Sequence, residues 1–158
     1  MTPLSRIAIT TLLIANNVHP TLAIGQNDAI NPAQATPGAC PEPAQVSALH
    51  LYGTWQASWD GLKGGAALTF GRNPNHPDGV GGIIRRDAGL PPPEALVAGD
   101  VDNGVFALEE STDGKVISAT WRGNVVAGSC GREIAGLWTR TSDRQEARFV
   151  LRKRPGWN

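Results

Sequence analysis

The sequence is poor in the residue types from which most catalytic and metal sites are built. It has two cysteines and three histidines in 158 residues. His50 and His76, the histidines beyond the N-terminal segment, have no ligand partner at the i+2 or i+4 position, which argues against zinc. No G-x-S-x-G stretch occurs, so the chain lacks the nucleophile elbow of a serine hydrolase. We expect no catalytic residue, no metal and no cofactor.

An excess of charge of one sign is also absent. Lysine and arginine together number 14, aspartate and glutamate number 14, and the formal net charge is zero. Nucleic-acid-binding domains carry a basic excess, so we expect no nucleic-acid partner. The charges are nonetheless segregated, because residues 49–114 have a net charge of −5 and residues 115–158 a net charge of +6. This asymmetry indicates either charge balance between neighbouring strands or a polarised surface for a charged partner.

A hydrophobic run long enough for a membrane helix is missing. The apolar run at residues 7–15 is about half of the ~20 residues that span a bilayer. It follows Arg6 and precedes a small-residue segment at 21–23, which is the order of a secretory signal peptide. We expect cleavage after Ala23 and export to the periplasm or the extracellular space. A buried N-terminal helix is the alternative interpretation.

The two cysteines fit an exported protein. An even number of cysteines without a metal or redox motif favours one disulfide, between Cys40 and Cys130. Closing so long a loop stabilises a fold by up to ~4–5 kcal/mol in the chain-entropy model. Cys40 lies within a stretch at 24–48 that is rich in alanine and proline, which predicts a flexible, disordered linker that the disulfide ties to the body. Lipid attachment at Cys40 is a weaker alternative, since it lies far beyond the apolar run.

The rest of the chain has the pattern of an all-β domain, with short alternating apolar runs between glycine-rich turns. Strands are expected at 50–59, 65–71, 80–86, 94–102, 105–111, 115–123, 132–140 and 146–153. Asn103-Gly104 and Asp113-Gly114 fit type I′ hairpin turns, which require positive φ. The sequence therefore predicts an eight-stranded antiparallel up-and-down meander barrel. The expected division is a signal peptide at 1–23, a linker at 24–48, the barrel at 49–154 and a C-terminal tail at 155–158.

Two aspartates, Asp100 and Asp102, share one face of an expected strand. A carboxylate pair is compatible with calcium binding or glycoside hydrolysis. The stretch fits no EF-hand, because its glycine comes one position too early and the closing glutamate is missing. We interpret both aspartates as solvated residues at a strand end, and a hydrolase as the least favoured function.

Tryptophan is comparatively frequent, with five residues against one tyrosine and three phenylalanines. Period-two alternation places Trp55 and Trp59 on one face of the first strand, with Ala57 between them. Trp121 and Trp138 occupy the same kind of position in the sixth and seventh strands. Small residues beside each tryptophan leave room for its ring inside a narrow barrel. The tryptophans either fill the core or line a cavity for a small apolar or aromatic ligand.

Three short motifs resemble a known superfamily. GTW at 53–55, together with Arg148 and Arg152, is similar to the calycin pattern of lipocalins and avidins, in which a first-strand tryptophan packs beneath a last-strand basic residue. SATWRG at 118–123 and EIAGLWTRTS at 133–142 resemble the paired tryptophan strands of the avidin and streptavidin family. The resemblance is confined to these patches.

This resemblance implies a ligand-binding barrel in which Trp121 and Trp138 stack on the ligand. It implies that Thr120 or Ser118 makes the polar contact. An avidin-like biotin binder is therefore one alternative. The sequence departs from that family in having no counterpart of its ureido-binding asparagine, serine and tyrosine, and the stretch at 146–153 lacks its aspartate.

Surface loops offer a different kind of site. The loop NPNHPDG at 73–79 holds His76 between prolines, and loops on a rigid barrel often carry function, although a plain surface loop is the simpler interpretation. Further expected partner contacts lie at the C-terminal end: Arg152, Arg154 and Trp157. The sequence thus predicts an exported, non-enzymatic binding module for a small ligand or a partner protein. A protein-binding inhibitor or adhesion-type module that acts through its loops is the main alternative.

Overall fold

The structure is a computed structural model that describes residues 40–87 and 92–156. The expected signal peptide, most of the expected linker and Trp157 lie outside these ranges. A 3-10 helix at Pro43–Gln45 and a short α-helix, α1 (Ala48–Leu51), precede the strands. The strands are β1 (Gly53–Trp59), β2 (Gly65–Arg72), β3 (Val80–Arg86), β4 (Glu94–Asp102), β5 (Val105–Ser111), β6 (Ala119–Val125), β7 (Glu133–Arg140) and β8 (Glu146–Lys153).

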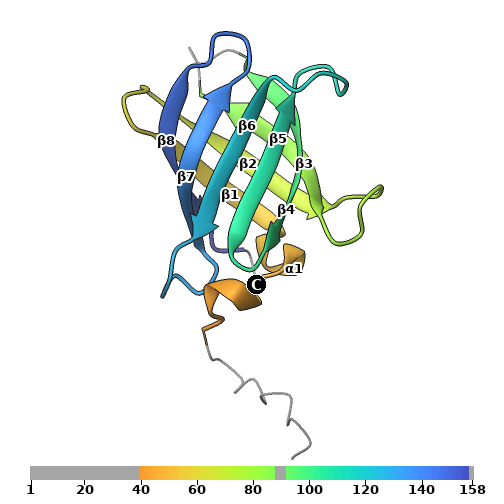
Figure 1. The fold of residues 1–158 in the computed structure, drawn as a ribbon, viewed down its shortest axis with the longest axis vertical. Helices are drawn as coiled ribbons and strands as arrows, with labels where there is room; N and C mark the ends of the chain where they lie inside the picture. Colours follow the sequence, from red (N-terminus) through yellow and green to blue (C-terminus); the bar gives the residue numbers. More distant parts are fainter. Residues whose placement is uncertain (1–39, 88–91, 157–158) are drawn as a thin grey trace, which may run out of the picture. The chain divides into compact units, whose positions relative to one another are not determined.

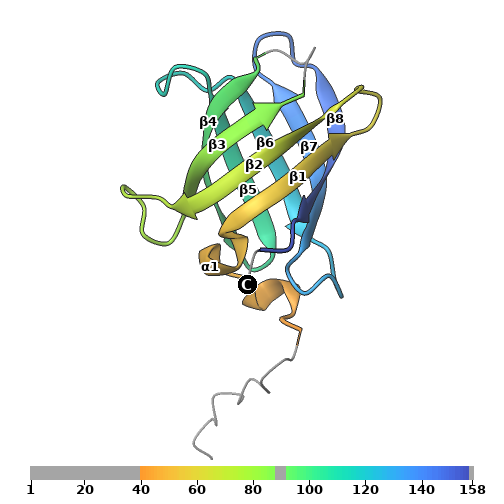
Figure 2. The same cartoon turned by 180° about the vertical axis from the view of Figure 1, so that it is seen from behind.

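The eight strands form a closed antiparallel barrel with up-and-down order, as predicted. Each strand pairs with the next along the chain, and β8 pairs with β1 to close the sheet. Figures 1 and 2 show the strands winding around one axis, with α1 at one end. We call this the α1 end, and the opposite end, where β1 finishes at Trp59, the far end. Within the described ranges, no helix is long and apolar enough to cross a membrane.

The start of β1 differs from the expectation, because residues 50–51 belong to α1 and not to the strand. The Ser47 side chain and the His50 ring cap each other's backbone groups, with Oγ and Nδ1 3.0 Å apart. Pro43 stands at the first position of the 3-10 helix, where a missing N–H leaves no hydrogen bond unmade. Leu51 is fully buried at the α1 end. Part of the stretch expected to be linker is thus folded against the barrel.

The turn at Asp113-Gly114 was predicted wrongly. Gly114 has φ +73, but Asp113 is not among the residues with positive φ, so this is no type I′ turn. The Asp113 carboxylate instead accepts hydrogen bonds from the backbone N–H groups of Lys115 and Val116, both at 2.9 Å. A wider loop at 112–118 results, and β6 begins at Ala119 in place of 115. The side chain of Asp113 thus stabilises a loop, whereas the sequence predicted that this residue forms a two-residue turn with Gly114.

The Asn103-Gly104 turn was predicted correctly. Both residues have positive φ, at +47 and +79. A Cβ atom on Gly104 would lie 2.9 Å from Cβ of Pro43, so the hairpin also packs closely on the 3-10 helix. Glycine is required there for its conformation and for its size.

A pair of glycines, Gly123 on β6 and Gly136 on β7, lets the backbones of these two neighbouring strands come close to each other. Gly123 is directly opposite Gly136 in the register. A Cβ on Gly136 would lie 2.1 Å from the carbonyl oxygen of Arg122 and 2.4 Å from Cα of Gly123. Such contacts are impossible for any larger residue, so these glycines permit the bending that closes a narrow barrel. Each glycine lies two residues from an inward tryptophan on its own strand, Trp121 on β6 and Trp138 on β7.

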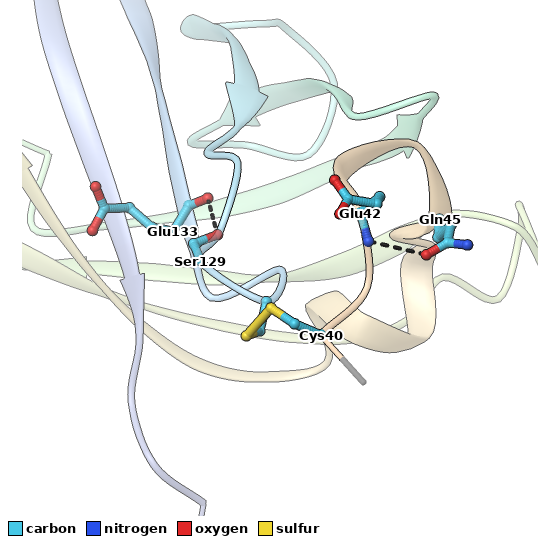
Figure 3. The surroundings of a disulfide bond; sticks show 6 residues. Cys40, Glu42, Gln45, Ser129 and Glu133 are labelled. Atoms are coloured by element: carbon cyan, nitrogen blue, oxygen red, sulfur yellow. Dashed lines mark hydrogen bonds between the residues drawn. A yellow bond between two sulfur atoms is a disulfide. The ribbon is translucent and has the colours of Figure 1, made fainter. Parts of the chain in front are cut away.

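The disulfide between Cys40 and Cys130 is present, as predicted, with an S–S distance of 2.06 Å. It joins the segment before the 3-10 helix to the loop between β6 and β7 (Figure 3). Glu42 N donates to Gln45 Oε1 at 3.0 Å on one side of the bond. On the other side, Ser129 Oγ lies 3.4 Å from the Glu133 carbonyl oxygen. The disulfide therefore ties Cys40, just before the 3-10 helix, to the α1 end of the barrel.

Candidate functional site

The first tryptophan of the GTW motif closes the α1 end. Trp55 is fully buried, and its indole N–H donates to the carbonyl oxygen of Leu51 at 2.7 Å. The basic group over its ring is Lys153, whose Nζ lies 5.8 Å from the ring centroid. Burial, and then the charge of Arg132, hold the pKa of Lys153 below its usual value.

Arg148 and Arg152, which the resemblance placed above this tryptophan, are exposed on the outer face instead. Arg152 forms an ion pair with Glu133 at 2.9 Å. The expected packing of a basic last-strand residue on Trp55 is therefore present, but the residue was assigned wrongly. Alternation explains the difference, since Lys153 lies on the same side of β8 as the buried Phe149 and Leu151, whereas Arg148 and Arg152 lie on the other side.

Three tryptophans gather at the far end, one each from β1, β6 and β7. The Trp59 ring lies 5.3 Å from the Trp121 ring and 6.1 Å from the Trp138 ring, measured between centroids. Trp121 also packs edge-on against Phe149 at 4.8 Å. All are buried, so this cluster fills the barrel interior.

A buried ion pair lies beside this cluster. Nη2 of Arg86 is 2.5 Å from Oε1 of Glu110, and the two side chains are 4% and 1% exposed. The other carboxylate oxygen of Glu110 accepts from the Trp121 indole N–H at 3.0 Å. The Arg86 guanidinium also lies 5.8 Å from the centroid of the Trp59 ring. Burial of these two charges is tolerated because they pair with each other and each has a further hydrogen-bond partner, the Trp121 indole for Glu110 and the Pro92 carbonyl oxygen for Arg86.

The sequence carries a signal for this pair that is missing from the predictions. Arg86 lies on the same side of β3 as the buried Val80 and Ile84. Glu110 lies on the same side of β5 as the buried Phe106 and Leu108. Period-two counting therefore places one charge of each sign inside. The alternating pattern does not show that the two side chains contact each other, because this contact depends on how the barrel closes.

Two polar groups of the cluster have no partner. The indole nitrogens of Trp59 and Trp138 are buried and without a hydrogen bond within the described part of the chain. Buried indole N–H groups are normally hydrogen-bonded. They mark the far end as a place where an acceptor atom would be favourable.

The remaining predicted ligand residues are spread apart. Trp55 is at the α1 end, four residues along β1 from Trp59, which corresponds to about 13 Å. Ser118 precedes β6, and its hydroxyl donates to the Glu110 carbonyl oxygen at 3.1 Å. Thr120 alternates with the buried Ala119 and Trp121 and so lies on the outer side of β6. The structure brings together Trp59, Trp121 and Trp138, with Ser118 at the edge of the group.

The hollows of the molecule lie elsewhere. Three of them are formed by described residues, and none of the three is lined by a tryptophan. The largest, of about 720 Å³, lies between the loop 73–79 and the outer faces of β4, β5 and β6. We call it the outer groove. His76, which the sequence singled out, is part of its lining.

The loop that bounds the outer groove is held by its own hydrogen bonds. Asn73 is 7% exposed, and its side-chain oxygen accepts from the N–H of Asn75 at 3.0 Å. Gly79 N donates to the carbonyl oxygen of His76 at 2.9 Å. The prolines at 74 and 77 restrict the backbone further. The loop projects from the ends of β2 and β3 as a preformed wall (Figures 1 and 2).

The outer groove is acidic and has a floor of small residues. The acidic residues that line it are Asp78, Asp100, Asp102 and Glu109. Ala98 and Ala107 contribute to the floor, and Arg122 is the lining arginine. The ion pairs found among residues 40–87 and 92–156 involve none of these five charged side chains. Their charges face the solvent unpaired.

The charge segregation seen in the sequence reappears on the outside of the barrel. Asp100, Asp102 and Glu109 are exposed on β4 and β5, whereas Arg122 and Arg148 are exposed on β6 and β8. A second hollow of about 430 Å³ follows on the basic side and shares Arg122 with the outer groove. Balance between neighbouring strands also occurs, as in the pairs Arg85–Glu94 and Arg152–Glu133.

The other predicted partner contacts do not join the outer groove. Arg154 lines a hollow of about 310 Å³ near Cys130 and donates to the Gln56 side chain. Arg152 is engaged with Glu133. Trp157 lies outside the described residues. Among the predicted partner contacts that the structure describes, His76 lines the outer groove and the two arginines do not.

The fold defines this protein as a closed eight-stranded antiparallel β-barrel, which is compatible with the calycin type. No family model matches the chain, and no curated protein matches it either. The likeness to avidins gains no support from these comparisons.

Proposed function

We propose that this protein is a non-enzymatic binding module that holds a partner protein in the outer groove. The observation that carries the proposal is a contrast in filling. The barrel interior is occupied by buried aromatic rings, whereas the largest of the three hollows described above lies outside it, under the loop 73–79. A site on a rigid barrel needs little ordering when a partner binds, which favours affinity.

The proposal includes export. The signal-peptide pattern at the N-terminus motivates this part of the proposal. The disulfide between Cys40 and Cys130 is compatible with an oxidising compartment, where such bonds persist. The partner would then be another exported or cell-surface protein.

Photo-crosslinking from within the outer groove tests this function. A photoreactive residue at Ala98, in the floor, is expected to trap a protein in the producing cell. The matched control is Ala67, an outward alanine of β2 that does not line the outer groove. The trapped protein, once purified, should bind the mature oxidised chain and lose binding to Ala98→Trp but not to Ala67→Trp. Equal trapping at both positions, or binding that survives Ala98→Trp, contradicts the proposal.

A small ligand at the far end is the second candidate, and the unpartnered indole N–H groups of Trp59 and Trp138 support it. The ligand would be a small apolar or aromatic molecule with one acceptor atom that reaches these donors. Its test is tryptophan fluorescence during titration with biotin, fatty acids and aromatic metabolites. A saturable change that Trp138→Phe abolishes supports it, and a flat response across the panel removes it.

A further inference from the structure

The outer groove has a charge pattern that specifies its occupant, provided that the proposed function holds. Asp100 on β4 is opposite Ala107 on β5, and Ala107 is opposite Arg122 on β6. These three positions therefore form one row across the outer face. Two strand spacings separate the carboxylate-bearing residue from the arginine, which corresponds to about 10 Å.

The row has a charge at each end and a small residue in the middle. Asp102, two residues from Asp100 on β4, extends the negative end, and Glu109 adds a further negative charge on β5, where it is opposite Ala98. Ala98 and Ala107 keep the floor low, so the main chain of a partner can approach the sheet closely. No three potential metal ligands gather in the described parts of the chain, so these carboxylates are better matched by an organic cation than by a metal ion.

We infer that the occupant is an extended segment of a partner protein that carries a lysine or arginine and, three residues away, an aspartate or glutamate. In polyproline II conformation, residues i and i+3 lie on the same side of the segment, about 9 Å apart. This distance matches the separation of Asp100 and Arg122 in the row. The basic side chain pairs with Asp100 and its acidic neighbours, and the acidic side chain pairs with Arg122.

The surrounding features suit such a segment. The closed barrel has no free strand edge, so a partner cannot add a strand and must lie on side chains. The loop 73–79 forms a wall on one side, with Pro77 and His76 exposed for contact. The charged side chains of the outer groove form none of the ion pairs found in the described ranges, so binding of a partner there breaks none of these pairs.

The test begins with a selection. A displayed library of random linear peptides is panned on the mature oxidised protein, with counter-selection on the Ala98→Trp variant. Enriched peptides are expected to contain a basic and an acidic residue three positions apart. Peptides enriched without such a pair overturn the inference, and so does a selection that enriches no peptide dependent on Ala98.

Charge reversal then tests the assignment of each end. A synthetic peptide of the enriched sequence should bind about tenfold more weakly to Asp100→Lys or to Arg122→Glu, as close interfacial charge pairs do. The double variant Asp100→Lys with Arg122→Glu should instead prefer the peptide in which the two charges are exchanged. Arg148→Glu, outside the outer groove, is the matched control and should change affinity little. Affinity that is unchanged by all reversals overturns the inference.

Other occupants give different results. A dimer in sedimentation velocity that Ala98→Trp dissociates would assign the outer groove to a second copy. Displacement of the peptide by millimolar spermidine, with no preference for an acidic residue, would assign it to a small cation. Either result overturns the inference. The proposed function fails separately, through equal crosslinking from Ala98 and Ala67.

Discussion

Glu109 and Glu110 are neighbours in the chain, yet they belong to two regions with opposite properties. Glu110 is 1% exposed, paired with Arg86 and bonded to Trp121. Glu109 is exposed on the outer face and forms no ion pair within the described ranges. In the interior, the charges of Arg86 and Glu110 are paired and the space is filled by side chains. In the outer groove, the charged side chains form none of the ion pairs found in the described ranges, and the space is empty of protein atoms. Burial therefore decides whether a carboxylate contributes to stability or remains free for a partner.

Removing one partner of the interior pair should give the largest effect. Glu110→Ala leaves Arg86 buried without an opposite charge, which typically costs about 3–5 kcal/mol of unfolding free energy. Glu109→Ala, one residue away, should change it by less than about 0.5 kcal/mol. Urea unfolding followed by tryptophan fluorescence measures both. Similar losses from the two substitutions would break the comparison between interior and surface.

The disulfide should come next. Replacing Cys40 and Cys130 together with serine is expected to cost about 2–5 kcal/mol, because the unfolded chain regains the freedom of a long loop. The loss should appear in thermal melting of the purified variant. Reduction of the native protein by dithiothreitol is the control and should lower the melting temperature similarly. An unchanged melting temperature would mean that the bond between Cys40 and Cys130 contributes little to the stability of the barrel.

The two ends of the interior can be compared through their indole groups. Trp55→Phe removes a hydrogen bond and leaves the Leu51 carbonyl oxygen unpaired, whereas Trp138→Phe removes a donor that had no partner. Both lose ring area, so the difference should isolate the hydrogen bond, with Trp55→Phe more destabilising by about 1 kcal/mol. Denaturant midpoints measure the difference. A larger loss for Trp138→Phe would indicate that its N–H has an acceptor.

The smallest effect is expected in the loop 112–118 at low pH. Backbone N–H groups of Val116 and Lys115, together with Ser111, hold the pKa of Asp113 below its usual value of 3.8. The ionised form therefore stabilises the loop above pH 3.8, and this contribution is lost as pH falls through the lower folded value. Hydrogen exchange at the Lys115 and Val116 amides should lose protection in that acidic window. Asp113→Asn, which cannot ionise, should show no such step.

The strands could be located from sequence because their signal is local. Alternation over β4, from Glu94 to Asp102, is complete within nine residues and fixes which side chains turn inward. Asn103-Gly104 likewise carries its turn conformation in its own residues. The predictions for residues 50–51 and for Asp113 were wrong, because a short helix and a loop capped by a side chain compete there with the alternating pattern. Both exceptions are decided by hydrogen bonds that local backbone N–H groups donate to a side chain, Asp113 in the loop and His50 in α1.

The candidate site was less accessible to sequence reasoning. His76 stood out because prolines flank it, but nothing in its loop reveals the acidic strands beside it. Arg86 and Glu110 are separated by 24 positions, and alternation alone cannot pair them. Asp100 and Arg122 fall in one row across β5 only through the register of two ladders. Such neighbours are set by long-range pairing.

The all-β class, most of the strand bounds, the inward tryptophans and the cysteine pair could be predicted from sequence, since each follows from short-range periodicity or from composition. Only the tertiary structure decided that the interior is filled, that a buried ion pair lies among the tryptophans, and that an acidic groove forms on the outside. The physical reason is closure. When β8 pairs with β1, every inward side chain must share one narrow space, and residues far apart in the chain become neighbours.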